Sequence, residues 1–234
     1  MPTQMEVLKA NLPRPVKRPL AWVRSKIIPK NTAALTYWKT RHQEENGRFL
    51  NDWYQKRMLW VAGESDPGFL KSKVVADFGC GPRGSLLWAK DAELRLGLDV
   101  LSQLYSSLFP GDVTSHNMLY VTTTEHAIPI PSDLVDVMYS VNSLDHVDNL
   151  ADMCDEIVRV MRPGGELIAS FNLNEYRTAS EPQTLTTKLL DSVLLSRFET
   201  TRQDYFLKYD GEQISREESD KRKCIMIYRG KLVA

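Results

Sequence analysis

Five short apolar runs alternate with helical patterns from residue 73 onward, and this alternation constrains the fold more than any other feature of the chain. The runs are continuously apolar, which is typical of strands that are buried on both faces of a parallel sheet. The segments between them have the helical spacing that crossover connections use. We therefore predict strands at Val74–Phe78, Leu94–Val100, Met118–Val121, Val135–Ser140 and Glu166–Phe171.

The last third of the chain adds two helices and two further strands. A helix at Asp148–Arg162 has Asp148 as its N-cap and is stopped by the Pro163-Gly164-Gly165 sequence, and a second is predicted at Leu185–Leu195. Strand-like runs at Asp204–Tyr209 and Cys224–Tyr228 are joined by a charged loop too short for a crossover helix, so they should pair as an antiparallel hairpin. The predicted fold class is α/β: a Rossmann-like, doubly wound, mostly parallel seven-stranded sheet with an antiparallel C-terminal hairpin and an N-terminal helical extension.

The charge of the chain is unevenly distributed although its net value is zero. Residues 1–41 carry nine Lys or Arg and one acid, so this segment has a formal net charge of +8 and the rest of the chain has −8. Five prolines in the segment restrict helices before residue 30 to short pieces. Net neutrality argues against binding of the whole surface to nucleic acid or anionic membrane, but it leaves RNA or lipid as a local partner of the basic arm.

At 234 residues the chain fits one domain with an appendage. We expect residues 1–72 to form a basic arm and helical cover on the acceptor side, and residues 73–234 to form the cofactor-binding domain. Apolar residues at 42% and charged residues at 26% exclude a wholly disordered chain. The longest apolar run of the arm is too short for a secretory signal, and none of the chain approaches the length of a membrane span.

A helical stretch from Asn31 to about Trp60 is predicted within the cover, with a break near Gly47. This stretch is rich in aromatic side chains, which either pack a core or line a ligand pocket, and we favour the core. The aromatic residues are Tyr37, Trp38, Trp53, Tyr54 and Trp60.

The three cysteines, Cys80, Cys154 and Cys224, lie far apart in the sequence and form no CxxC pair. This pattern argues against a disulfide framework and against a zinc site. We therefore expect a reducing, cytoplasmic compartment and no metal.

The first predicted strand leads directly into a glycine-rich loop with the sequence Gly79-Cys80-Gly81-Pro82-Arg83-Gly84. In this context a GxGxxG loop lets a ligand approach the backbone, and we expect the helix after it to present free amides. Asp99 lies twenty residues beyond Gly79 at the end of the second strand, where its carboxylate can accept hydrogen bonds from both ribose hydroxyls. Together these features indicate a nucleoside cofactor.

The residue before the first glycine discriminates between two cofactor classes. A carboxylate at Asp77 would repel the pyrophosphate of a dinucleotide, whereas it would attract the ammonium group of S-adenosylmethionine. The alternative is that Asp77 only caps the loop and contacts no ligand.

Four segments, VVADFGCGPRG, LGLDV, DVMYSVNSLDHVDN and RVMRPGGELIAS, resemble in order and spacing the motifs of class I S-adenosylmethionine-dependent methyltransferases of the small-molecule type. The resemblance covers residues 74–171 and implies S-adenosyl-L-methionine as cofactor, with S-adenosyl-L-homocysteine as product. It implies an adenine contact at Thr124, which departs from the acid usual in the family, so that Glu125 is the alternative. The cofactor-binding residues that it implies are Asp77, Gly79, Cys80, Gly81, Asp99, Val100, Thr124, Glu125 and Ser140.

Residues 140–146 follow the fourth strand and would face the transferred methyl group. Our catalytic candidates among them are His146, Asn142 and Asp145. A histidine suits a general base, although His146 can instead position the helix that follows it. The polar loop Asn172–Arg177 would be either a lid that recognises the acceptor or ordinary solvated surface.

The function expected from the sequence is methyl transfer to a hydroxyl or amine of a small-molecule or glycan-type acceptor. Two alternatives remain open at this point. One is a non-catalytic cofactor-binding or scaffold protein of the same fold, and the other is an RNA- or lipid-associated methyltransferase guided by the basic arm.

Overall fold

A computed structural model describes residues 30–208 and 211–233 of the chain. The predictions for residues 1–29 and Tyr209 therefore lie outside the described residues. In chain order the elements are α3 (Lys30–Glu44), α4 (Tyr54–Ala62), η1 (Pro67–Leu70), β1 (Val74–Phe78), β2 (Leu94–Asp99), α5 (Ser102–Leu108), α6 (Pro110–Ser115), β3 (Leu119–Thr122), β4 (Val135–Val141), η2 (Leu144–His146), α7 (Leu150–Val160), β5 (Met161–Leu173), α8 (Thr187–Val193), η3 (Leu195–Arg197), β6 (Phe198–Leu207), β7 (Gln213–Ile214), α9 (Arg216–Ser219) and β8 (Cys224–Leu232).

The described strands form one sheet in the order β3-β2-β1-β4-β5-β8-β6-β7. Neighbouring strands from β3 to β5 are parallel, whereas β8 runs antiparallel to both β5 and β6. The predicted fold class is confirmed, including the antiparallel pairing of the two C-terminal strands. The sheet has one strand more than the seven predicted, because the two-residue β7 forms within the charged loop and pairs with β6.

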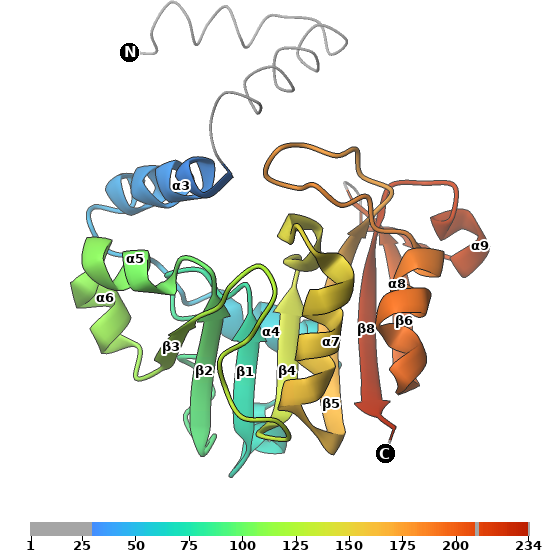
Figure 1. The fold of residues 1–234 in the computed structure, drawn as a ribbon, viewed down its shortest axis with the longest axis horizontal. Helices are drawn as coiled ribbons and strands as arrows, with labels where there is room; N and C mark the ends of the chain where they lie inside the picture. The colour runs from blue at the N-terminus through green and yellow to red at the C-terminus, as the bar shows by residue number, and fades with distance from the viewer. Residues whose placement is uncertain (1–29, 209–210, 234) are drawn as a thin grey trace, which may run out of the picture.

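Helices cover the two faces of the sheet in the doubly wound manner (Figure 1). On one face α7 and α8 pack against the sheet, and α7 buries the stripe Leu150, Met153, Cys154, Ile157 and Val160. On the other face α4 and η1 pack against β1, β4, β5 and β8 in a second apolar cluster. The three cysteines are all buried and free.

Helix α7 is shorter at both ends than the sequence predicted. It begins at Leu150 with Asn149 at the N-cap, so the prediction that Asp148 caps it is wrong. It ends at Val160, because Met161 enters β5. The Pro163-Gly164-Gly165 sequence lies where the pairing of β5 with β4 is irregular, and Gly164 has a φ of 78° there. Sheet pairing between Val135 and Met161 satisfies backbone groups that another helical turn would otherwise have used.

The helix expected after the glycine-rich loop is absent: residues 79–93, all of them described, contain turns and no helix. Pro82 lacks an N–H group, and Gly84 has a φ of 71°, a left-handed conformation that interrupts a right-handed helix. Buried Leu86 and Ala89 in these turns pack with α4 on the second face of the sheet. Helix α4 therefore covers part of the face where a crossover helix was expected.

The predicted helical stretch from Asn31 to Trp60 is present and is divided by residues 45–53, as the break near Gly47 suggested. None of the residues of the described helix α3 is buried. Tyr37, Trp53 and Trp60 are 51%, 44% and 46% exposed, so the core-packing interpretation is wrong for these three aromatic residues. Among the described residues, no helix has the length and apolar character needed to cross a membrane.

Candidate active site

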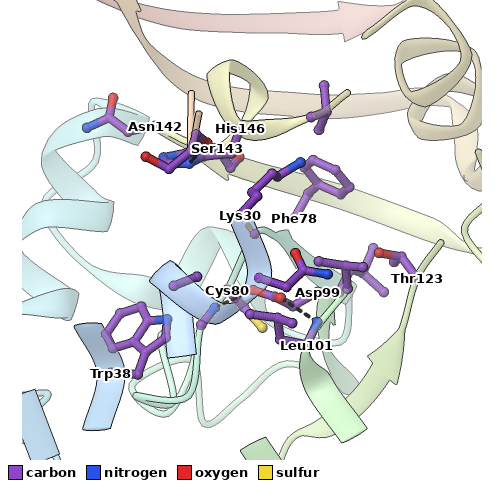
Figure 2. Close-up of a pocket in the computed structure, with 18 of the residues that line it drawn as sticks. Lys30, Trp38, Phe78, Cys80, Asp99, Leu101, Thr123, Asn142, Ser143 and His146 are labelled. Carbon is purple, nitrogen blue, oxygen red and sulfur yellow. Dashed lines mark hydrogen bonds between the residues drawn. The ribbon is translucent and has the colours of Figure 1, made fainter. Parts of the chain in front are cut away.

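A cavity of about 580 Å³ is lined by residues at the carboxyl ends of β1, β2 and β4 and by residues of α3. Figure 1 shows α3 above this edge of the sheet. Figure 2 shows Asn142, Ser143 and His146 gathered on one side of it and Cys80, Asp99 and Leu101 on the other. The predicted site residues that line the cavity are Gly79, Cys80, Gly81, Asp99, Val100, Thr124, Glu125, Asn142 and His146. The predicted residues that are buried behind its wall are Asp77, Ser140 and Asp145.

The glycine loop is packed so closely that side chains at its first two glycines would collide with the protein itself. Gly79 has a φ of 75°, and a Cβ there would overlap the Cβ of Ser143. Gly81 has a φ of 59°, and a Cβ there would lie 2.7 Å from Cζ2 of Trp38 in α3. These positions therefore need glycine both for their backbone conformation and for close packing. Between them, burial raises the pKa of the Cys80 thiol well above its usual value.

Asp99 holds the ends of β1 and β2 together. Its Oδ2 atom accepts a hydrogen bond from the Gly81 N–H at 3.1 Å, and its Oδ1 atom accepts one from the Leu101 N–H at 2.9 Å. Burial raises the pKa of Asp99, although hydrogen bonds that include one from the Tyr105 hydroxyl act in the opposite direction. A carboxylate has about four acceptor sites. Gly81, Leu101 and Tyr105 use three of them, so Asp99 retains capacity for one further hydrogen bond, such as one from a ribose hydroxyl.

Asp77 is 4% exposed and lies behind the glycine loop, where its carboxylate accepts a hydrogen bond from the Ser85 hydroxyl. Burial raises the pKa of Asp77 to about 7; the Ser85 hydrogen bond lowers it and the nearby Asp99 carboxylate raises it further. The contact with Ser85 is the one that a loop-capping acid would make. The raised pKa also means that a cation brought to the loop would stabilise the ionised carboxylate.

The two residues implied for adenine recognition both line the cavity but have other contacts. The Thr124 hydroxyl accepts hydrogen bonds from the N–H groups of His126 and Ala127 at 3.2 and 2.9 Å, which uses it in a local turn. Glu125 lies 3.6 Å from Nζ of Lys30, which is also 3.2 Å from Asp148. Lys30 thereby ties the start of α3 to the rim of the cavity.

The end of β4 supplies the opposite wall. Asn142 has a φ of 52°, its N–H donates to the Ser170 carbonyl at 2.9 Å, and its Oδ1 accepts from the Ser170 hydroxyl at 2.9 Å. Ser140 is 1% exposed and shares a hydrogen bond of 2.8 Å with the Ser143 hydroxyl. These contacts fix the backbone and the side chain of Asn142 at the edge of the cavity.

His146 is oriented by a backbone carbonyl. Its Nδ1 lies 2.8 Å from the Ser180 carbonyl oxygen, which can only accept, so Nδ1 carries the proton and donates it. Its Nε2 lies 3.8 Å from Oδ1 of Asp145. Asp145 is 3% exposed, and its Oδ2 accepts a hydrogen bond from Asn172 at 3.3 Å. The three catalytic candidates therefore come from one short segment, residues 142–146.

The loop over this side of the cavity begins later than the sequence predicted. Asn172 and Leu173 belong to β5, and the residues of the following loop that reach the cavity are Ser180 and Glu181. In Figure 1 this loop is the long orange segment between β5 and α8.

Several cavity residues were not assigned to a ligand site from the sequence. The aromatic density of residues 37–60 did signal Tyr37, Trp38 and Tyr54, but a core was favoured there. No comparable signal exists for the others, because their position depends on contacts between distant segments. The residues that were missed include Lys30, Asn31, Tyr37, Trp38, Tyr54, Tyr105, Thr123, Ser180 and Glu181.

A second, smaller cavity of about 290 Å³ adjoins the first between α3 and α4. The two cavities share Tyr37, Trp38 and Tyr54 in their walls. The aromatic residues of the N-terminal cover thus form a boundary between the larger cavity and a groove at its side.

Comparison with known proteins finds similar sequences for the central part of the chain. The family described as "Methyltransferase domain" matches residues 76–169. The chain is 33% identical over 110 residues to the malonyl-[acyl-carrier protein] O-methyltransferase of Enterobacter lignolyticus (strain SCF1), a match that covers 45% of this chain and 43% of that protein. It is 27% identical over 139 residues to the tRNA U34 carboxymethyltransferase of Hydrogenovibrio crunogenus (strain DSM 25203 / XCL-2), covering 56% and 42%. These matches span less than half the length of either relative.

Solved structures share the fold. The complex of the Haloferax volcanii Trm112 methyltransferase activator with a putative methyltransferase aligns with a TM-score of 0.62 and 15% identity, covering 86% of this chain and 97% of that chain. A SAM-dependent methyltransferase from Aquifex aeolicus aligns with a TM-score of 0.55 and 17% identity, covering 77% and 92%. At these identities the likeness concerns the fold alone.

The larger cavity fits S-adenosylmethionine, the cofactor of this family. Its volume lies within the range of roughly 300 to 1,000 Å³ that is usual for small-ligand sites. Asp99 offers an acceptor lone pair for a ribose, and the buried Asp77 carboxylate is suited to a cationic ligand. Residues 76–169 match the family described as a methyltransferase domain, and the fold of the chain is one that solved S-adenosylmethionine-dependent methyltransferases share.

Proposed function

We propose that this protein transfers a methyl group from S-adenosylmethionine to a hydroxyl group, or alternatively an amine, of a small-molecule or glycan-type acceptor. The observation that carries the proposal is that the cofactor candidates Gly79, Gly81 and Asp99 line the same cavity as His146 and Asn142. A cofactor held by the first group and an acceptor held by the second would meet inside one cavity.

When it is bound, S-adenosylmethionine supplies a methyl carbon on a positively charged sulfur, and transfer leaves the electrons of the broken C–S bond on sulfur. The protein's task is then mainly to orient the acceptor. Correct orientation can contribute about 7 to 11 kcal/mol to lowering a barrier. The apolar side chains of Phe78, Leu98 and Val141 on the cavity wall favour the exclusion of water from the acceptor.

We assign activation of the acceptor to His146. Because its Nδ1–H donates to Ser180, the Nε2 lone pair is available to a proton or another cation. Asp145 lies on the Nε2 side of the ring and would stabilise positive charge there. Asn142, whose side chain is fixed by Ser170, is assigned to acceptor positioning.

The N-terminal cover supports an acceptor of moderate size with an apolar portion. Residues 30–54 provide Lys30, Tyr37, Trp38 and Tyr54 to the cavity walls, in agreement with residues 1–72 acting as an acceptor-side extension of the domain at 73–234. The adjoining groove would hold the part of the acceptor that is not methylated. The O-methyltransferase among the relatives favours oxygen over nitrogen as the acceptor atom.

A transfer assay with S-adenosylmethionine labelled in its methyl group tests this proposal. Small hydroxyl and amine compounds and cell extract are offered as acceptors, and the labelled product is identified by mass. We expect label on a low-molecular-weight hydroxyl compound with the parent protein and loss of label with Asp99→Ala. Cofactor binding without transfer to any acceptor would contradict catalysis and support the scaffold alternative.

The +8 charge of residues 1–41 favours a second candidate, an acceptor carried by RNA or an anionic lipid surface. RNA binding of this kind weakens steeply as salt is added. Binding of labelled tRNA and of anionic vesicles is measured in 50 and 200 mM salt, with the full chain and with a chain lacking residues 1–29. A polyanion affinity that is unchanged by the deletion would reject a role for the arm.

A further inference from the structure

We propose that Asp145, His146 and Glu181 bind a divalent metal ion at the acceptor end of the cavity. One potential ligand atom from each of these residues lies within 4.8 Å of the others. Ligand atoms that share one ion about 2.1 Å away are roughly 3 to 4 Å apart, so the three side chains need only small rotations to close on it. The use of this ion in catalysis rests on the proposed function, whereas its binding does not.

The hydrogen bonding of His146 is that of a metal ligand. Metal-binding histidines generally donate their second ring N–H to a carbonyl or carboxylate, which fixes the tautomer and the ring orientation. Nδ1 of His146 donates to the Ser180 carbonyl at 2.8 Å, so the lone pair is on Nε2. Nε2 lies 3.8 Å from Oδ1 of Asp145. Two acceptors at this separation call for a positive ion between them.

Asp145 provides an independent indication of a missing ligand. The residue is 3% exposed, and among the described residues its Oδ1 atom is buried without a hydrogen-bond partner. Buried carboxylate oxygens are normally paired or coordinated, because an unsatisfied one bears the full cost of desolvation. Its other oxygen is satisfied by Asn172. Oδ1 is also the oxygen that lies toward Nε2 of His146, so the unsatisfied atom points into the proposed site.

The third ligand is held in place by the docking of its loop. Gln183 donates its backbone N–H to the Asp145 carbonyl at 3.3 Å, and its side chain donates to the carbonyls of Val147 and Asp148 at 3.0 Å each. With the bond from His146 to Ser180, these contacts fasten residues 180–183 onto residues 145–148. Glu181 lies within this fastened stretch and lines the cavity, and its Oε2 atom also accepts a hydrogen bond from the Thr178 hydroxyl at 3.4 Å.

One imidazole and two carboxylates suit Mn²⁺ or Zn²⁺ better than softer metals. Three protein ligands leave at least one position for water or substrate, as in catalytic metal sites. The expectation of no metal was drawn from the spacing of the cysteines, whereas this donor set contains no cysteine, so the proposal replaces that expectation. An acceptor hydroxyl on the ion would lose its proton to water more readily, and the freed oxygen electron pair would form the new bond to the methyl carbon.

Metal binding is measured directly on the full chain after treatment with chelator and its removal. MnCl₂ is titrated and free Mn²⁺ is followed by electron paramagnetic resonance, and ZnCl₂ is titrated by calorimetry. We expect one ion per chain and an affinity reduced at least tenfold by Glu181→Gln. Glu181 is partly exposed, so this variant should fold normally; Asp145→Asn should weaken binding similarly, with its fold checked by circular dichroism.

The matched control is Asp152→Asn. Asp152 pairs with His126 at 2.9 Å on the exposed surface, which gives a histidine-carboxylate pair outside the proposed site. This variant should bind metal with the same affinity as the parent protein.

Two results would overturn the metal site: the absence of one bound ion per chain, or a metal affinity that is unchanged in Glu181→Gln. Binding of S-adenosylhomocysteine to the chelator-treated protein is measured in parallel. If S-adenosylhomocysteine binds but metal does not, only the metal site is rejected. If S-adenosylhomocysteine does not bind, the proposed function is rejected.

Discussion

The carboxylate of Asp99 accepts a hydrogen bond from the Gly81 N–H at 3.1 Å, so the acid that ends β2 is fastened to the glycine loop that follows β1. The two strands are parallel neighbours, with Asp77 opposite Gly97 and Phe78 opposite Leu98. This pairing brings their carboxyl ends to the same edge of the sheet. The glycine loop and Asp99 therefore act as one unit in shaping this edge of the cavity.

Replacement of Asp99 by alanine should weaken S-adenosylhomocysteine binding by at least tenfold. The variant loses a ribose hydrogen bond to a charged group, worth about 1.5 to 3 kcal/mol, and it releases the glycine loop. Asp99→Asn, which keeps one acceptor oxygen, should lie between the variant and the parent. Calorimetry gives the affinities, and Asp155→Ala on the exposed side of α7 serves as control. Equal affinity of Asp99→Ala and the parent protein would refute the ribose assignment.

Gly79→Ala should destabilise the protein and abolish cofactor binding. A Cβ at this position overlaps Ser143, and the left-handed backbone costs a non-glycine residue roughly 1 to 2 kcal/mol before any clash. Gly111→Ala is the matched control, because it lies in α6 with nothing within 4 Å and should leave stability unchanged or improve it. Urea unfolding compares the two. Similar free energies of unfolding for both variants would contradict the close packing of position 79 against Ser143.

Asp77 should make the ligand-free protein less stable as the pH rises from about 4 to about 7. Its pKa is raised to about 7 by burial, whereas in the unfolded chain it stays near its usual value of 3.8. Between pH 4 and pH 7 the folded state therefore holds a proton that the unfolded state releases. The contribution of Asp77 to the free energy of unfolding is fully present below pH 4 and is lost as the pH approaches 7. The stability difference between the parent and Asp77→Asn, measured by urea unfolding, should fall across the window. A difference that is constant with pH would contradict this.

Trp38→Ala should weaken both cofactor and acceptor binding, by about tenfold for the cofactor, which corresponds to roughly 1.4 kcal/mol. Trp38 packs on Gly81, and its side chain lines both cavities. Trp60→Ala is the control, since Trp60 is 46% exposed, contacts Phe206 and lines neither cavity. S-adenosylhomocysteine affinity and the KM for the acceptor are the measurements. An effect of the same size in both variants would point to general destabilisation instead.

The sheet could be predicted from the sequence because its signals are local. Val74–Phe78 is buried at all five positions, and such a run has few alternatives to a central strand. The same holds for the glycine loop and for Asp99, whose positions follow from the ends of two adjacent strands. The helix expected after the loop was predicted wrongly. A GxGxxG loop normally opens a helix, but here Pro82 and the left-handed Gly84 interrupt one.

The acceptor side was less accessible from sequence because it is built by contacts between distant segments. Glu181 reaches the cavity only because Gln183 and Ser180 bond to residues 145–148, and no local pattern marks those contacts. Lys30 reaches Glu125 across 95 positions of sequence for a similar reason. The spacing of charged and apolar residues predicts helices and strands. The tertiary contacts of the acceptor side depend instead on how the loops dock against distant parts of the chain.

The central claim, that the larger cavity binds S-adenosylmethionine, is tested most directly by isothermal titration calorimetry of the full chain with S-adenosylhomocysteine, with NAD as the competing ligand class. The account predicts one S-adenosylhomocysteine per chain, its displacement by S-adenosylmethionine, and no binding of NAD, whose pyrophosphate the carboxylates of Asp77 and Asp99 would repel. Binding of NAD in the absence of S-adenosylhomocysteine binding, or binding of neither ligand, would contradict it.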